Sequence, residues 1–314
     1  MKYFDDISKI NHIDDAIVTV GIFDGIHRGH NAIFSKMREI KNAKGGDIVV
    51  ITFEPHPREV LVKSPEPVKY INSKGRKLDM FAKLDVDIVV DVHFDKNFAM
   101  LSTEDFLKQY IVKFFKPSYI VVGYDCHFGH DNEDTLSILK AFAPTFGYHV
   151  MQIPPVYFDN TIISSSKIRK ALVEGDVDTA NKMLGYEYNI YGQVVYGSQI
   201  GRTIGFPTVN LYIENNLKLI AAKGVYACKI KWHDNFYFGM CNIGNRPTVN
   251  GSNTTIEVNI FDFNREIYGE NICVFLCKKM RNEVKFDNLL LLKEQLEKDK
   301  IAIREYFHLK DVVN

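Results

Sequence analysis

Two histidines at a turn between an apolar stretch and a helical pattern are the first residues that could do chemistry. They are His27 and His30, at the end of the sequence VTVGIFDGIHRGH. Free backbone N–H groups at the start of a helix attract phosphate, and imidazoles can donate hydrogen bonds to its oxygens. Gly25 and Gly29 would let the backbone approach a ligand closely. The pattern indicates charge stabilisation during phosphoryl or nucleotidyl transfer, although two surface histidines on a helical turn would give the same spacing.

A second helix start, IISSSKIRKAL, combines hydroxyl groups with cations. Ser164, Ser165 and Ser166 can cap a helix, and Lys167 and Arg169 follow within its first turns. A simple capped helix is one interpretation. Combined with the histidine turn, the same residues predict a two-sided clamp for a triphosphate.

A third candidate, GSQIGRTIGFPTVN, joins glycines and an arginine to polar residues that enter a strand. Gly201 and Gly205 permit close backbone approach to phosphate, and Arg202 adds a cation. Alternation along the strand places Thr208 and Asn210 on one face. Two neutral oxygen ligands there could hold a Mg²⁺ ion whose other ligands are nucleotide phosphates and water.

A fourth candidate is the carboxylate in TTIEVNIFDF. Strand alternation turns the apolar side chains toward the core and leaves three polar side chains on the other face. The apolar set is Ile256, Val258 and Ile260, and the polar set is Thr255, Glu257 and Asn259. Spacing alone allows Glu257 to be either a general base or a solvated strand residue.

The elements that must position these residues follow two different secondary-structure patterns. From residue 17 to residue 154, short β-branched stretches alternate with helical patterns, which predicts an α/β unit with a parallel sheet covered on both faces. After residue 186, strands recur at short intervals between turns, which predicts a small antiparallel barrel. A long amphipathic helix over 286–306 ends the pattern. We expect two domains, 1–185 and 186–314.

Composition excludes several classes of protein. Lysine plus arginine equals aspartate plus glutamate at 39 each, so no global field attracts nucleic acid or an anionic membrane. Five cysteines without a C-x-x-C pair argue against a disulfide framework or a zinc site. No apolar stretch reaches the length of a signal or a membrane span, so we expect a cytoplasmic protein. The oligomeric state is not fixed by the sequence, and a monomer is compatible with it.

The stretches GIFDGIHRGH, TFEPHPREVL and ISSSKIRKAL resemble the N-terminal module of bacterial bifunctional riboflavin kinase/FAD synthetases. The resemblance implies a Rossmann-like nucleotidyltransferase fold that uses ATP and Mg²⁺, in which the FMN phosphate attacks the α-phosphorus of ATP to give FAD and pyrophosphate. His27 and His30 match the signature histidines of that family. The other positions implied to bind ATP are Gly21, Phe23, Asp24, Gly29, Ser164, Ser165 and Arg169.

The stretch GYDCHFGHDNED departs from the family pattern at the implied flavin side of this module. Asp125 and Phe128 are retained as flavin-binding candidates, but Cys126 and His127 stand where an aromatic residue and an arginine are usual. Three acidic residues replace basic ones, namely Asp131, Glu133 and Asp134. The lost positive charge leaves open a riboflavin kinase with impaired or lost FAD synthesis. His56, between two prolines in TFEPHP, allows either a structural or a catalytic role, and it is left out of the predicted site.

The second half resembles the riboflavin kinase module of the same enzymes, through GRTIGFPTVN, KGVYACKI, NIGNRPTV, IEVNIFDF and YGENICVFL. The resemblance implies a six-stranded antiparallel β-barrel with a C-terminal helix. Its P-T-x-N motif maps onto Thr208 and Asn210 as metal ligands, with Val209 where alanine is usual. The catalytic base maps onto Glu257, and Gly201, Arg202 and Gly205 would bind ATP.

Together the two resemblances imply an enzyme that phosphorylates riboflavin to FMN and then adenylylates FMN to FAD. Its expected ligands are riboflavin, FMN, FAD and ATP, with Mg²⁺ as cofactor and neither nucleic acid nor a membrane as partner. A flavin- or nucleotide-binding regulator without turnover is the alternative from another class.

Overall fold

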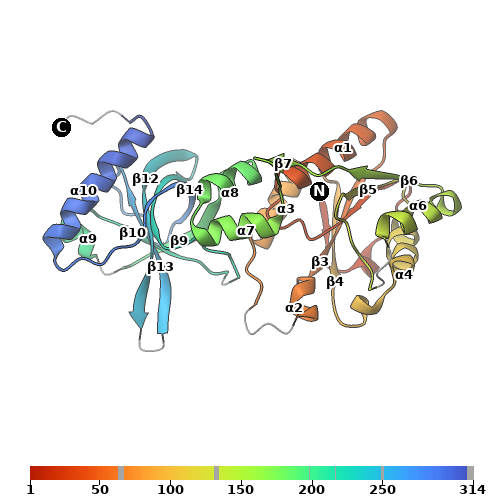
Figure 1. The fold of residues 1–314 in the computed structure, drawn as a ribbon, viewed down its shortest axis with the longest axis horizontal. Coiled ribbons are helices and arrows are strands. Elements are labelled where there is room, and N and C mark those ends of the chain that lie inside the picture. The colour runs from red at the N-terminus through yellow and green to blue at the C-terminus, as the bar shows by residue number, and fades with distance from the viewer. Residues whose placement is uncertain (63–66, 131–133, 198, 216, 249–250, 310–314) are drawn as a thin grey trace. The chain divides into compact units, whose positions relative to one another are not determined.

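The structure is a computed structural model that describes the chain except for residues 63–66, 131–133, 198, 216, 249–250 and 310–314. The chain divides into two compact units, Met1–Ser165 and Ser166–Asn314 (Figure 1). Each unit is described by itself below. The domain boundary between residues 185 and 186 stays a prediction. Two helices, α7 (Ser165–Glu174) and α8 (Val177–Leu184), lie in the sequence between that predicted boundary and the boundary of the compact units.

The first unit is built on a six-stranded sheet whose strand order is β1-β4-β3-β2-β5-β6. Every pairing in this sheet is parallel. The strands are β1 (Lys2–Phe4), β2 (Ile17–Val20), β3 (Ile48–Glu54), β4 (Ile88–His93), β5 (Tyr119–Gly123) and β6 (His149–Ile153). The sheet confirms the α/β fold that the alternating rhythm predicted.

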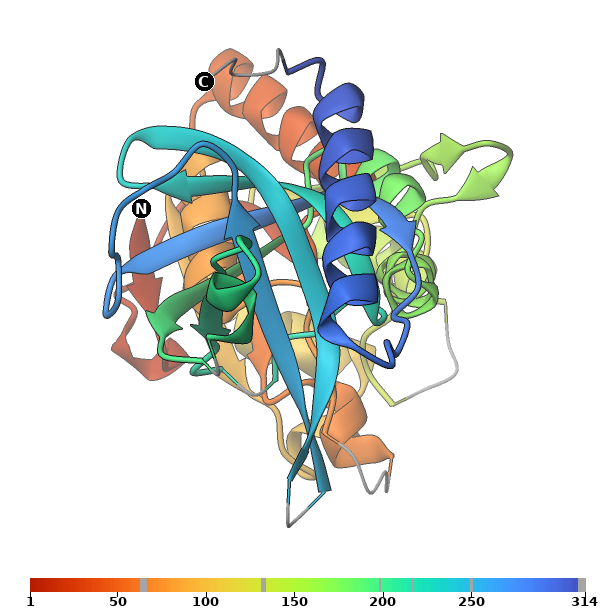
Figure 2. The ribbon, with the colours of Figure 1, turned by 90° about the vertical axis from the view of Figure 1, so that its left-hand side faces the viewer.

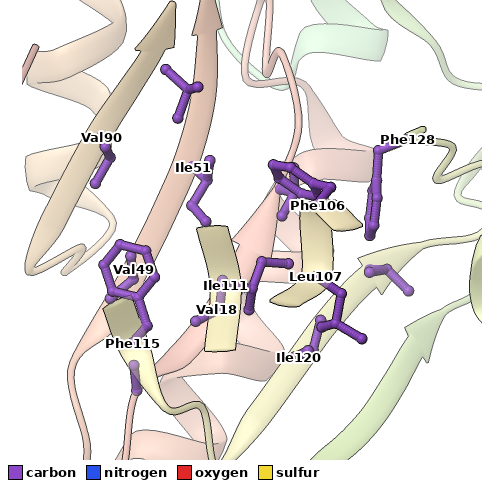
Figure 3. Packing of buried hydrophobic residues seen from close by; sticks show 14 of the residues in the cluster. Val18, Val49, Ile51, Val90, Phe106, Leu107, Ile111, Phe115, Ile120 and Phe128 are labelled. Carbon is purple, nitrogen blue, oxygen red and sulfur yellow. The ribbon is translucent and has the colours of Figure 1, made fainter. Parts of the chain in front are cut away.

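Helices cover both faces of this sheet, and the buried side chains form two clusters. Val49 and Ile51 of β3 pack with Phe106 and Phe115 on one face (Figure 3), whereas the intervening Val50 joins a cluster on the other face. Because consecutive residues of β3 are buried on opposite faces, the strand is apolar throughout. The helices are α1 (Arg28–Lys44), α2 (Pro57–Leu61), α3 (Lys74–Lys83), α4 (Thr103–Phe106), a π-helical segment (Leu107–Val112), α5 (Lys113–Phe115) and α6 (Thr135–Phe146).

Short elements complete this unit. Two single 3₁₀ turns occupy Ile7–Lys9 and Phe98–Met100, and β7 (Tyr157–Phe158) pairs with β8 (Thr161–Ile162). Residues 103–115 form one continuous helical segment whose middle part, Leu107–Val112, is π-helical rather than α-helical.

The second unit contains a closed barrel of six antiparallel strands in the order β10-β13-β12-β11-β14-β9. The strands are β9 (Asn189–Val195), β10 (Val209–Tyr212), β11 (Gly224–Trp232), β12 (Asn235–Thr248), β13 (Gly251–Ile260) and β14 (Asn271–Arg281). A short helix, α9 (Ile200–Thr203), precedes β10. The barrel confirms the fold predicted for the second half.

The last helix, α10 (Leu289–Tyr306), lies beside the barrel, and the β12–β13 hairpin extends beyond the barrel body (Figure 2). The helix begins at Leu289, three residues after the predicted start at Phe286. Asn288 is the N-cap, and its side chain accepts a hydrogen bond from the Leu291 N–H at 2.9 Å. An N-cap satisfies one of the free donors of the first turn, so the helix begins after Asn288.

Candidate active sites

The two histidines of the first unit stand at the start of the 17-residue helix α1. The turn from β2 into α1 needs left-handed backbone at Phe23, Gly25 and Ile26, whose φ angles are 51°, 85° and 34°. His27 is the N-cap, and its Nδ1 accepts a hydrogen bond from the His30 N–H at 3.4 Å. The two rings stack with their centroids 3.6 Å apart. The interpretation of the pair as surface histidines is therefore wrong, since His27 is only 5% exposed.

Burial keeps both imidazoles neutral. Desolvation lowers the pKa of His27 to about 4, and burial together with the neighbouring His27 and Lys77 lowers the pKa of His30 well below its usual range. Because the Nδ1 atom of His27 accepts a hydrogen bond, its proton is on Nε2. A neutral imidazole of this tautomer can donate one N–H to an anion without carrying charge. The pair is therefore suited to binding developing negative charge rather than to forming a fixed ion pair.

Neighbouring residues fix the orientation of these rings. The ring of Phe23 meets the ring of His30 edge-on, with centroids 5.1 Å apart. A side chain on Gly29 would bring its Cβ to 3.1 Å from the His27 ring, and a side chain on Gly21 would bring its Cβ to 3.1 Å from the Phe23 ring. Both glycines thus leave room for aromatic rings at the turn, whereas Gly29 was predicted to let a ligand approach the backbone.

Asp24 stabilises the turn by hydrogen bonds to the backbone of the segment before α3. Its buried carboxylate accepts hydrogen bonds from the backbone N–H groups of Ile71, at 3.0 and 3.1 Å, and of Asn72, at 3.3 Å. The Ser165 hydroxyl donates to the backbone carbonyl of Asp24 at 2.8 Å. These contacts make Asp24 a residue that positions the histidine turn, and they tie the start of α7 to it.

A half-buried lysine near the histidines was not predicted from the sequence. Lys77 of α3 donates to the backbone carbonyl of Ile22 at 3.4 Å and to the Thr52 hydroxyl at 3.2 Å. Desolvation lowers its pKa. Its place at the carboxyl ends of β2 and β3 adds positive potential where ligands of open parallel sheets bind. Only a helical pattern marks this residue in the sequence, so no local signal distinguishes it from a surface lysine.

A cavity of about 910 Å³ opens beside this turn. Such a volume suits a mononucleotide or flavin ligand. Aromatic side chains form much of its wall, and the predicted site residues that line it are Gly21, Phe23, His30, Asp125, Phe128 and Ser165. Among the described residues that line the cavity, additional cationic or imidazole groups come from Lys96, His56, His127 and His130. The other predicted residues do not line it: His27, Asp24 and Gly29 lie in the turn, Ser164 precedes α7, and Arg169 is half-buried on α7.

The loop that departs from the family pattern is anchored in the fold of the first unit. Phe128 packs edge-on against Phe106 with centroids 5.0 Å apart, and its carbonyl accepts a hydrogen bond from the Thr103 hydroxyl at 2.7 Å. Burial raises the pKa of Cys126 to about 12, so this residue is a neutral thiol in the cavity wall. The anchored loop keeps Phe128 in place despite the changed residues around it.

One of the three acidic residues of this loop has a structural explanation. Asp134 caps α6 by accepting hydrogen bonds from the backbone N–H groups of Leu136 at 3.3 Å and Ser137 at 3.2 Å. Asp131 and Glu133 lie outside the described residues. The carboxylate of Asp134 therefore interacts with the N-terminus of α6.

His56 also caps a helix, as its structural interpretation implied. Its Nδ1 accepts a hydrogen bond from the Arg58 N–H at 3.1 Å at the start of α2. The same residue lines the cavity. The sequence analysis left His56 out of the site, and the cavity lining makes it a further candidate for contact with a ligand.

The second unit has its own cavity, of about 370 Å³, beside the barrel. One part of its wall is apolar and includes Phe206, Met240 and Phe286. The polar part contains three residues from the predicted kinase site, Gly201, Thr208 and Glu257, together with Asn242, Asn245, Thr255, Arg281 and Glu283. A cavity lined by both apolar and polar side chains can hold a ligand that has an aromatic part and a polar part.

The glycine-rich loop closes tightly at one end of this cavity. A Cβ on Gly201 would overlap with the backbone carbonyl oxygen of Phe206, and Gly205 has a φ of 86°. Arg202 is exposed and lies 3.8 Å from Glu266. Arg202 and Gly205 are therefore near the cavity in sequence but do not line it.

Strand register places Glu257 in the middle of a polar row. Ile256 and Val258 are buried at 3% and 0% exposure, so the alternation predicted for β13 is confirmed and Glu257 faces the cavity side. Asn210 of β10 is directly opposite Glu257 on one side, and Asn242 of β12 is directly opposite it on the other. Directly opposed residues project to the same face of a sheet.

Asn210 is held against the glycine loop. A Cβ on Gly197 would overlap with the amide group of Asn210, so the absence of a side chain at Gly197 makes room for that amide. Thr208 lies just before β10 and lines the cavity with Glu257. The neutral oxygens of Thr208 and Asn210 fit a Mg²⁺ ion that takes its remaining ligands from phosphates and water. Among the described residues, no group of three or more histidine, cysteine or acidic side chains forms a metal site.

A buried ion pair fastens α10 to the barrel at the cavity wall. Arg281 donates from Nε to both carboxylate oxygens of Asp299 at 3.0 Å and from Nη2 to Oδ2 at 2.7 Å. The Gln295 amide donates to the same carboxylate at 2.8 Å. This bidentate pair was not predicted, because its members are 18 residues apart and lie in different elements.

Two family models match the chain. One described as FAD synthetase matches residues 9–167, and one described as riboflavin kinase matches residues 184–307. None of the helices in the described part of the chain combines the length and the apolar composition that crossing a membrane requires.

Relatives with the name bifunctional riboflavin kinase/FMN adenylyltransferase match this chain over almost its whole length. The relative from Buchnera aphidicola subsp. Acyrthosiphon pisum (strain APS) is 36% identical, over 98% of this chain and 99% of its own. The relative from Bacillus subtilis (strain 168) is 37% identical, over 93% and 92%. The relative from Escherichia coli (strain K12) is 34% identical, over 94% of each.

A solved structure also matches nearly the full chain. It is a crystal structure named as a macrolide-efflux protein from Streptococcus pneumoniae, with a TM-score of 0.89 and 32% identity. The match covers 96% of this chain and 98% of that one. The parallel sheet and the barrel therefore each have a counterpart in that protein.

Proposed function

Because the chain belongs to the bifunctional riboflavin kinase/FMN adenylyltransferase family, we propose that its two reactions are carried by the two residue clusters described above. The chain phosphorylates riboflavin to FMN and adenylylates FMN to FAD, with ATP as co-substrate in both steps. What we propose is which residues carry each reaction, that the metal ion is Mg²⁺, and that the reactions take place in the cytoplasm.

The adenylyl transfer is assigned to the histidine turn of the first unit. A phosphate oxygen of FMN attacks the α-phosphorus of ATP, a new P–O bond forms, and the bond to the bridging oxygen breaks as pyrophosphate leaves. The neutral imidazoles of His27 and His30 donate hydrogen bonds to the oxygens on which charge develops, together with the backbone N–H groups that begin α1. The observation that carries this assignment is the stacked, neutral histidine pair at a helix N-terminus, in which His27 is buried and His30 is half-buried.

Other residues of this module bind or position the substrates. Gly21, Phe23 and Asp24 shape the turn, and Gly29 makes room for His27. Ser164, Ser165 and Arg169 are proposed to complete the phosphate site. Asp125 and Phe128 are proposed to contact the flavin, because both line the 910 Å³ cavity.

The phosphorylation of riboflavin is assigned to the cavity beside the barrel. Glu257 accepts the proton of the ribityl 5′-hydroxyl as that oxygen attacks the γ-phosphorus of ATP, and ADP leaves. The glycine loop with Gly201, Arg202 and Gly205 is proposed to bind the phosphates. Thr208 and Asn210 would hold Mg²⁺, which supplies positive charge to the phosphates when it is bound.

A time course tests the proposed function. The purified protein is incubated with riboflavin, ATP and Mg²⁺, and riboflavin, FMN and FAD are separated by chromatography. We expect FMN to appear first and then to decline as FAD rises. Accumulation of FMN without FAD, even when FMN is supplied, would show that the altered loop at residues 124–134 has removed the second reaction.

A further inference from the structure

Lys77 binds the backbone just before the histidine turn through contacts that neither proposed reaction uses. The Gly21 N–H donates to the Ile51 carbonyl at 3.0 Å, so the pairing with β3 extends one residue beyond β2. The carbonyl of the following residue, Ile22, is bound by two side chains. Lys77 and the Thr52 hydroxyl each donate to it at 3.4 Å, and Lys77 also donates to that hydroxyl at 3.2 Å. We call Lys77, Thr52 and the Ile22 carbonyl the carbonyl cluster.

The backbone that follows the carbonyl cluster is strained. Phe23 and Ile26 have φ angles of 51° and 34°, in the left-handed region that residues with side chains rarely adopt. Such backbone persists only where its surroundings hold it. The carbonyl of Ile22 belongs to the peptide that enters Phe23, so the cluster fixes the turn on this side. A hydrogen bond from the Ile26 N–H to the Phe23 carbonyl, at 3.3 Å, fixes it on the other side.

The strained residue contacts one of the proposed catalytic rings. The ring of Phe23 meets the ring of His30 edge-on at 5.1 Å between centroids, and His30 stacks on His27 at 3.6 Å. Phe23 and His30 both line the 910 Å³ cavity. A displacement of the Ile22–Phe23 peptide would therefore move the ring of His30 relative to a ligand in that cavity.

We propose that Lys77 is a positioning residue for adenylyl transfer, whose ammonium fixes the Ile22 carbonyl and, through the turn that follows, the ring of His30. The inference rests on the function proposed for the histidine pair. Lys77 is not among the described residues that line the cavity, so it acts through the turn and not by contact with a substrate.

The charged groups around Lys77 favour its ammonium form. Desolvation lowers the pKa of Lys77, whereas the carboxylates of Asp91 on β4, Glu54 on β3 and Asp24 in the turn raise it. Lys74, on the same helix, opposes them and is itself paired with Asp91 at 2.7 Å. An ammonium has three N–H donors and no acceptor, which suits a cluster of two oxygen atoms.

The same positive charge acts on His30. Burial lowers the pKa of His30, and the neighbouring His27 and Lys77 lower it further. Removing the cation should therefore raise the pKa of His30, so that its ring becomes protonated at a higher pH. A protonated ring repels the cation and loses the neutral form that is proposed to bind developing charge.

Two substitutions separate the carbonyl cluster from the charge. Lys77→Met removes the ammonium and keeps a long side chain, so kcat for FAD formation from supplied FMN should fall by about 10²-fold, the loss expected for a displacement of about 1 Å at a reacting group. Thr52→Val keeps the shape and the cation but removes the hydroxyl, so kcat should fall by less. KM for ATP should change less than kcat in both variants.

The pH profile gives a result that a purely structural role would not produce. In Lys77→Met the acid limb of kcat/KM for ATP should move to higher pH by about one unit, because a cation beside the ring has been removed. Lys77→Arg and Thr52→Val keep the positive charge, so their limbs should stay at the wild-type pH even where kcat falls.

Lys83→Met is the matched control. It is the same substitution in the same helix, α3, at an exposed position, and it should leave kcat and the limb unchanged. Thermal unfolding reports whether each variant is folded. If Lys77→Met does not fold, Thr52→Val decides the question, and a wild-type kcat in that variant would overturn the inference.

Three results for a folded Lys77→Met would also overturn it. Wild-type kcat and limb would mean that Lys77 has no part in the reaction. A raised KM for ATP with unchanged kcat and limb would mean that Lys77 binds the nucleotide. A loss of kcat with an unmoved limb, shared by Lys77→Arg and matched by lower stability, would mean that Lys77 only supports the fold. Full FAD formation by His30→Ala would instead contradict the proposed function, whatever Lys77 does.

Discussion

The two proposed sites are built in different ways. The adenylylation site depends on residues close together in the sequence, because His27 and His30 share one helical turn and Gly29 lies between them. The kinase site depends on strand register, which brings Asn210, Glu257 and Asn242 from three strands into one row. In our proposal, neutral imidazoles of the first site bind developing charge, whereas a carboxylate at the cavity of the second site accepts a proton. The sites should therefore fail independently and respond differently to pH.

Loss of the base should have the largest effect. Glu257→Gln removes the proton acceptor but keeps the size of the side chain, so kcat for riboflavin phosphorylation should fall by about 10²–10⁴-fold. The rate of FMN formation is followed by chromatography. FAD formation from supplied FMN should be unchanged, and a parallel loss of both steps would show that the two sites are coupled.

Loss of one signature histidine should lower the rate of FAD formation at the adenylylation site, by slightly less than the loss of Glu257 lowers riboflavin phosphorylation. His27→Ala removes a hydrogen bond to the charge that develops as pyrophosphate leaves, so kcat for FAD formation should fall by about 10²–10³-fold. Pyrophosphate release gives the rate. His56→Ala, which removes a nearby helix cap, is the comparison variant, and a loss as large as that of His27→Ala would move the central role to His56.

Breaking the Arg281–Asp299 pair should affect the stability of the barrel unit. Asp299→Ala leaves a partly buried guanidinium without its carboxylate, and the free energy of unfolding should fall by about 3 kcal/mol. Thermal unfolding measures the loss, and KM for riboflavin should rise because α10 forms part of the cavity wall. Lys170→Ala removes an exposed partner 3.9 Å from Glu174 and should leave the stability nearly unchanged. Equal losses in the two variants would contradict the role assigned to the buried pair.

Acid should destabilise the first unit through His27. Its pKa of about 4 lies below the unfolded value near 6.5, so the unfolded chain binds the extra proton between these values. The stabilisation from the neutral ring is thus fully present above about pH 6.5 and is lost as the pH falls toward 4. Urea unfolding of the wild type and of His27→Gln between pH 4 and 7 measures this slope. An unchanged slope in the variant would mean that other groups cause the acid sensitivity.

The first site is built from a local sequence motif and the second from the register of three strands. This difference also explains which features could be predicted from the sequence. The parallel sheet, the barrel and the histidine turn follow from patterns within a few residues, and they were predicted. The N-cap role of Asp134 was not recognised, because the same residue was interpreted as lost positive charge near the flavin. Lys77 of α3 is placed by its partners Ile22 and Thr52, which lie 55 and 25 residues away in the sequence. Single-sequence patterns do not fix such long-range pairings, because periodicity assigns a residue to a face but not to a neighbour.

Two variants assayed with two substrates test the central claim that one chain carries two separate sites. His27→Ala and Glu257→Gln are each incubated with ATP and Mg²⁺ and with either riboflavin or FMN, and the products are separated by chromatography. The account predicts that His27→Ala converts riboflavin to FMN and stops, while Glu257→Gln leaves riboflavin unchanged but converts FMN to FAD. If either substitution abolished both reactions in a folded protein, the assignment of separate sites would be contradicted.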